Sequence, residues 1–104
     1  MTHKATEEFG AMIFLEDTDD WNAFIEAFRR AGFHAVKIKS PDDPDDPEDY
    51  DFLFVTKHAD DDGSAVMDAI RSIVLSLGRG LSDMSELGPT EIDLVRAEVP
   101  HPLN

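Results

Sequence analysis

The sequence predicts an α+β domain of ferredoxin-like type: βαββαβ order, a four-stranded antiparallel sheet and two helices on one face. Strand-like and helix-like segments alternate in the order of a split βαβ fold. The first and third strand segments are continuously apolar, as central strands require, whereas the second and fourth alternate, as edge strands do. A length of 104 residues suits one domain, so we expect residues 1–104 to form a single unit.

The first half of the chain supplies a strand, a helix and a strand. Residues 10–16 (GAMIFLE) form an apolar run that is typical of a buried strand. Residues 17–20 (DTDD) offer helix N-caps, and Gly32 is suited to end the helix. Residues 33–39 alternate in polarity and predict a half-exposed strand. The apolar stripe of the intervening helix comprises Trp21, Phe24, Ile25 and Phe28.

The second half repeats this order. Residues 52–56 (FLFVT) predict a strand, and the turn at residues 60–64 precedes a second helix. We expect residues 81–89 to be an irregular connection and residues 90–99 to be the final strand, ended by Pro100. In that strand Ile92 and Leu94 would face inward. The apolar stripe of the second helix comprises Val66, Ile70, Ile73, Val74 and Leu77.

The amino-acid composition limits the classes of function that the chain can have. The formal net charge is −14, from 23 acidic and nine basic residues. The absence of cysteine excludes disulfides, thiolate zinc sites and thiol catalysis. The N-terminus has no apolar signal core, and no apolar run has membrane-spanning length, so we expect a cytoplasmic protein. Adaptation to high salt would also explain the charge.

Residues 40–51 (SPDDPDDPEDYD) form an acidic, proline-rich loop between two predicted hairpin strands. They carry seven carboxylates, no basic group, and a proline at every third position, which matches the period of polyproline II. Regularly spaced carboxylates on such an arm can imitate a phosphate backbone and occupy a basic groove. The predicted partner contacts are Asp42, Asp43, Asp45, Asp46, Glu48 and Asp49.

This loop favours a non-enzymatic binding module that inhibits a partner by covering its basic, nucleic-acid-binding surface. As a class, the chain resembles small acidic inhibitors of nucleases, restriction systems and CRISPR effectors (anti-CRISPR proteins), and some toxin-immunity proteins. Two alternatives stay open. One is a small-molecule-binding regulatory domain or minor enzyme of a halophilic organism, with a pocket between the open sheet face and residues 81–89. The other is a structural homodimer.

The sheet face away from the helices is a second candidate surface. If Phe14, Phe52 and Phe54 point outward together with Met12, they form an aromatic platform for self-association or a partner. Residues 13–15 (IFL) and 52–55 (FLFV) resemble the two signature segments of RNA-recognition motifs, in which the aromatic side chains stack on bases.

The chain departs from that signature at four positions: Tyr50 replaces a basic residue, Asp51 and Leu53 replace small ones, and Lys57 replaces an aromatic one. A chain of charge −14 also repels phosphate. We therefore expect no direct binding of nucleic acid.

Catalytic and metal-binding patterns are weak. No serine has a nucleophile-elbow context, and we expect neither catalytic residues nor a cofactor. Asp60 and Asp62 resemble part of a calcium loop, but His58 and Ala69 occupy ligand positions that need carboxylates. His34 and His58 would face each other in a hairpin centred near Asp46, which makes them weak metal candidates; we predict no metal.

Overall fold

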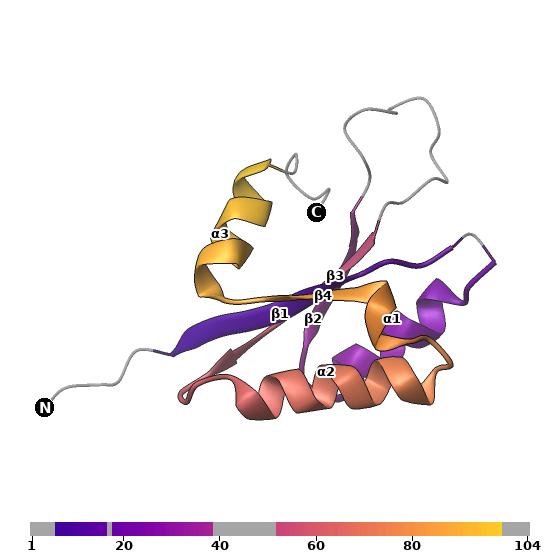
Figure 1. The fold of residues 1–104 in the computed structure, drawn as a ribbon, viewed down its shortest axis with the longest axis horizontal. Coiled ribbons are helices and arrows are strands. Elements are labelled where there is room, and N and C mark those ends of the chain that lie inside the picture. Colours follow the sequence, from indigo (N-terminus) through magenta and orange to yellow (C-terminus); the bar gives the residue numbers. More distant parts are fainter. Residues whose placement is uncertain (1–5, 17, 39–51, 99–104) are drawn as a thin grey trace, which may run out of the picture.

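A computed structural model describes residues 6–16, 18–38 and 52–98 and shows an antiparallel four-stranded sheet with three α-helices in those residues (Figure 1). The α+β class and the antiparallel sheet are thus confirmed. In chain order the elements are β1 (Glu7–Ile13), α1 (Trp21–Arg30), β2 (His34–Ile38), β3 (Phe52–Ala59), α2 (Ser64–Ser76), the 3₁₀ turn η1 (Leu81–Asp83), β4 (Met84–Leu87) and α3 (Pro89–Glu98).

The strand order is β2-β3-β1-β4, which places the two continuously apolar strands at the centre of the sheet, as predicted. β1 and β3 pair along their whole length, from Glu7 opposite Ala59 to Ile13 opposite Leu53. The side chains of Ile13 and Leu53 are fully buried, because both belong to the apolar cluster that the sheet forms with α1 and α2.

The last part of the chain differs from the prediction. The final described strand lies at Met84–Leu87, within the segment expected to be irregular, and residues 90–98 of the expected strand belong to α3. The prediction of only two helices is therefore wrong. Pro89 occupies the first helical position, where its missing N–H has no cost. Leu94, expected inside, is 59% exposed, whereas Ile92 is fully buried.

Gly88 explains why a helix begins there. Its carbonyl accepts the first helical hydrogen bond from the Ile92 N–H (3.0 Å). Its own N–H donates to Oε1 of Glu91 at 3.2 Å, which is half of a capping box. These two hydrogen bonds favour a helix here more than the short alternation of apolar and polar residues favours a strand.

The main core lies between the sheet and the pair of helices α1 and α2. The carboxylate of Asp20 caps α1 by accepting the Ala23 N–H at 3.1 Å. Gly63 precedes α2 with φ of +82°, and a Cβ there would lie 2.5 Å from the Phe9 ring, so glycine is required. Helix residues buried in this core are Phe24, Phe28, Val66, Ile70 and Val74.

No helix in the described ranges is both long enough and apolar enough to cross a membrane.

Candidate interaction surface

The sheet face opposite α1 and α2 is the candidate surface, and the strand register fixes its layout. Met12 of β1 lies opposite Phe54 of β3, and Phe54 lies opposite Val36 of β2, so these three side chains form one row across the sheet. The next row along β2 and β3 pairs Ile38 with Phe52. Because side chains alternate along a strand, all five share one face.

Helix α3 covers one part of this face, and Figure 1 shows it on the side of the sheet opposite α2. Ile92 of α3 packs with Ile38, Phe54 and Leu87 in a second, smaller apolar cluster. Phe54 is consequently only 5% exposed. The four residues of the predicted platform therefore do not lie in one environment.

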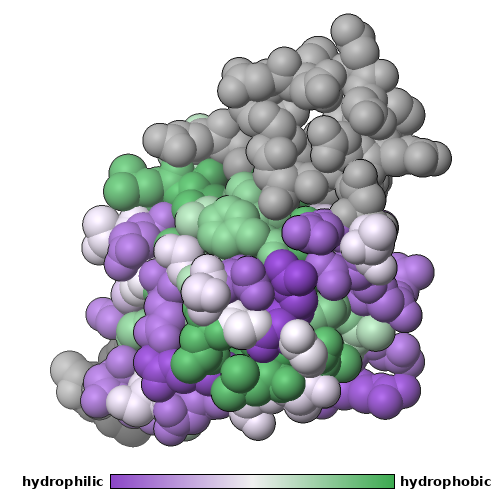
Figure 2. All heavy atoms as spheres, turned by 45° about the vertical axis from the view of Figure 1, so that its right-hand side comes forward, coloured by the Kyte–Doolittle hydropathy of each residue, from purple (hydrophilic) through white to green (hydrophobic). Residues whose placement is uncertain are grey.

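The other part of the face remains accessible. Phe14 is 42% exposed, and its ring lies beside that of Phe52, with centroids 6.1 Å apart. Met12 and Phe52 are half-buried. Figure 2 shows hydrophobic side chains gathered in two areas of the molecular surface, with hydrophilic side chains between them. The accessible part of the predicted platform thus centres on Phe14 and Phe52.

A partly buried polar cluster joins α3 to the sheet. The guanidinium of Arg96 donates to both carboxylate oxygens of Glu8, one of them at 2.7 Å, and Thr56 also hydrogen-bonds Glu8. Arg96 lies over the Phe54 ring, 5.8 Å from its centroid. These hydrogen bonds, led by that from Arg96, hold the pKa of Glu8 below its ordinary value despite its partial burial.

The two histidines lie on this face but not opposite each other. His34 pairs with Thr56, and His58 pairs with Glu8. The expected direct pairing of His34 with His58 is wrong because the β2–β3 register, which aligns Ile38 with Phe52, is shifted by two residues along β3. Within the described part of the chain, no group of three or more His, Asp or Glu residues could hold a metal ion.

All five arginines of the chain interact within the fold. Arg29 donates to the Ala35 carbonyl, Arg79 pairs with Asp19 and Asp83, and Arg96 pairs with Glu8. The two others, Arg30 and Arg71, pair with Glu26 and Glu86 respectively. Lys57 donates to the Ala31 carbonyl at 2.9 Å, at the C-terminus of α1. Four of the five arginines thus form ion pairs with carboxylates of the same chain.

Several carboxylates, in contrast, lie on the exposed surface. Glu7, Asp60, Asp61 and Asp93 are all exposed side chains. With four of the five arginines paired to carboxylates, such groups dominate the electrostatic potential that an approaching molecule meets. The described surface therefore carries more exposed negative than positive charge that lacks a partner of opposite sign.

The six predicted contacts Asp42, Asp43, Asp45, Asp46, Glu48 and Asp49 lie outside the described residues. The strands on either side of them are described, and Ile38 pairs with Phe52, so residues 39–51 connect two hydrogen-bonded strands. Sequence reasoning missed the contact between Glu8 and Arg96. The two residues are 88 positions apart, and no local pattern relates them.

No protein-family model matches this chain, and no similar protein is found among curated proteins or solved structures.

Proposed function

We propose that the protein is a non-enzymatic acidic module that occupies a basic, nucleic-acid-binding surface of a partner protein, as an inhibitor would. The observation that carries this proposal is that four of the five arginines pair with carboxylates of the chain itself, which leaves the other exposed carboxylates to set the surface potential of a chain of charge −14. Such a potential speeds encounter with a cationic surface and disfavours phosphate.

The fold supports this use of the loop. We interpret the arrangement as ferredoxin-like with α3 added, because β1 and β3 are central and β2 and β3 are adjacent. A loop that joins two paired strands is held at both ends, so ordering its carboxylates against a partner costs less entropy than ordering a free tail. The proposed contacts remain the six loop carboxylates.

The test is displacement of a short fluorescein-labelled DNA duplex from protamine, a basic DNA-binding protein. The test variant replaces the six loop carboxylates, from Asp42 to Asp49, by Asn or Gln. A matched control removes six exposed carboxylates elsewhere: Glu7, Asp20, Glu26, Asp60, Asp61 and Asp93. We expect the loop variant to need about tenfold more protein for half-displacement, and the control less than about threefold more.

Added salt should weaken displacement by the wild type more than by the loop variant, because fewer charged contacts are screened in the variant. If the loop substitutions and the control substitutions reduce displacement of the DNA equally, net charge acts without a defined contact surface. An unchanged loop variant would refute the proposed contacts.

A second candidate function is self-association through the accessible part of the open face, which the exposed Phe14 ring beside Phe52 favours. Sedimentation of wild type and Phe14→Ser at matched concentrations tests it. Leu75→Ser, at a 55% exposed site on α2, is the control. A dimer that Phe14→Ser dissociates and Leu75→Ser leaves intact would support this function, whereas a wild-type monomer would exclude it at those concentrations.

A further inference from the structure

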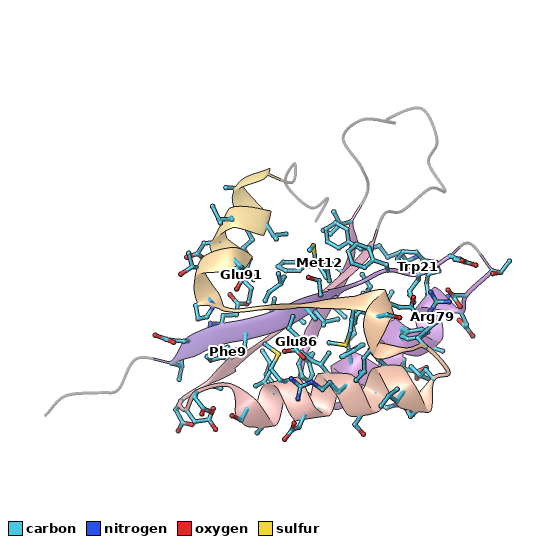
Figure 3. All side chains as sticks on the ribbon, viewed as in Figure 1. Phe9, Met12, Trp21, Arg79, Glu86 and Glu91 are labelled. Atoms are coloured by element: carbon cyan, nitrogen blue, oxygen red, sulfur yellow. The ribbon has the colours of Figure 1, made fainter. Side chains whose placement is uncertain are left out.

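A groove of about 670 Å³ lies between the first half of α2, the end of β4 and the start of α3. Its volume is within the range of ligand-binding clefts. Figure 3 shows Glu86 directed from β4 toward α2, with Phe9 on the same side of the sheet and Glu91 at the start of α3. The lining residues that matter here are Phe9, Met67 and Leu87, and the charged Asp62, Asp68, Arg71, Glu86 and Glu91.

The apolar lining is well fixed. Phe9 and Leu87 are 8% and 4% exposed, and Met67 is half-buried. The Phe9 ring packs against Gly63, where even a methyl group would clash. An aliphatic chain laid in the groove would therefore contact mainly the half-buried Met67, beside the small exposed parts of Phe9 and Leu87.

The charges of the groove select a cation. Asp62 and Asp68 lie on the α2 side, and Glu86 and Glu91 on the side of β4 and α3. Among the described lining residues, Arg71 is the single cation opposed to these four carboxylates. An anion would be repelled, and an uncharged apolar ligand would desolvate carboxylates without replacing their hydrogen bonds.

Arg71 shows that a guanidinium suits this groove. Its Nε donates to Oε1 of Glu86 at 2.7 Å, and its Nη1 donates to Oδ1 of Asp68 at 3.3 Å. Glu91 and Asp62 use Oε1 and Oδ1 to accept backbone N–H groups. An ionised carboxylate has about four acceptor positions, so both retain the capacity to accept further donors.

We propose that this groove binds an arginine side chain of the partner protein, with its aliphatic part against Met67 and its guanidinium between Glu91 and Asp62. Arginine is favoured over lysine because its planar group donates to two carboxylates at once. This inference rests on the proposed function and gives it a second contact. β3 begins at Phe52, which follows the acidic loop in sequence, and ends at Ala59, a few residues before Gly63, so the groove lies at the end of β3 away from the attachment of the loop.

The test is an NMR titration of the ¹⁵N-labelled protein with the acetylated, amidated peptide Gly-Leu-Arg-Leu-Gly. The control peptide carries citrulline, a neutral isostere of arginine. We expect the arginine peptide to shift the amide signals of Gly63, Ser64, Met67 and Gly88, and the citrulline peptide to bind about tenfold more weakly or not at all.

The matched protein variants are Asp62→Asn with Glu91→Gln, and Asp93→Asn with Glu26→Gln. Asn and Gln keep the oxygen that accepts the backbone N–H, so the helix starts are preserved and only the charge is lost. We expect the first pair to weaken binding about tenfold and the second pair to leave it within about twofold.

Equal binding of the citrulline peptide, shifts spread evenly over the protein, or an unaffected groove variant would each overturn the inference. The outcome is separable from that of the proposed function. If the peptide binds the groove while the loop variant still displaces DNA from protamine, the proposed loop contacts are refuted and the groove inference is supported. If the loop variant loses displacement but the peptide ignores the groove, only the groove inference fails.

Discussion

The two faces of the sheet are stabilised very differently. On the face under α1 and α2, large side chains such as Phe28, Ile13 and Ile70 are fully buried in one continuous cluster. On the other face a single helix, α3, buries Ile92, and a polar group of Glu8, Thr56 and Arg96 completes the contact. The first face therefore carries global stability, and the second can open or bind without unfolding the domain.

The largest expected effect is on the helix-covered face. Phe28→Ala should lower the free energy of unfolding by about 3–5 kcal/mol, because the ring is fully buried and its removal leaves a cavity. That is a large share of the stability of a domain of this size, roughly 5–15 kcal/mol. Urea unfolding followed by Trp21 fluorescence measures it. If Phe28→Ala lowers the free energy of unfolding by less than Ile92→Ala does, the face under α1 and α2 is not the one that contributes more to stability.

Ile92→Ala should cost about 2–3 kcal/mol, and we expect that cost to appear locally, as detachment of α3. Native-state hydrogen exchange should accelerate at the α3 amides and leave those of β1 and β3 unchanged. Leu94→Ala is the matched control on the same helix, at a 59% exposed site, and should stay within about 0.5 kcal/mol of wild type. Equal acceleration in the central strands would show that α3 unfolds only with the whole domain.

The same contrast explains which parts of the fold the sequence predicted. The helix-covered face follows from long patterns: apolar stripes on two helices and two continuously apolar strands, all of which the structure confirms. In residues 90–99 only Ile92 and Leu94 alternate with polar residues. A pattern of two residues is too short to distinguish a strand from a helix. Ile92 and Val95, three positions apart, fit a helix equally well, and Gly88-Pro89 was the start signal that decides between them.

The candidate surfaces were less predictable for a physical reason. Strand periodicity identifies Phe14 and Phe52, but the cover over Phe54 depends on α3, which lies in a segment whose alternation predicts a strand. The contacts of the groove and the pairing of Glu8 with Arg96 join residues distant in sequence. Such pairs follow from the arrangement of elements, which must be known first.

The smallest expected effect concerns the ion pair that holds α3. Arg96 lowers the pKa of Glu8 in the folded protein relative to the ordinary value of 4.5. A carboxyl whose folded pKa is lowered stabilises the fold fully above its unfolded pKa, and that stability is lost as pH falls through the folded pKa. We expect the contribution to be about 1 kcal/mol at neutral pH, because the Arg96 side chain is 48% exposed and the pair is partly screened.

Glu8→Gln should therefore accelerate hydrogen exchange of the α3 amides several-fold at pH 7, and the difference from wild type should shrink as pH falls below 4.5, where Glu8 itself becomes protonated. Glu7→Gln is the neighbouring control, because Glu7 is exposed and on the opposite face. His58 faces Glu8 across the strands, so the same comparison in a His58→Gln background isolates the effect of the carboxyl. A difference between wild type and Glu8→Gln that persists undiminished at low pH would mean that shape, and not charge, holds α3 in place.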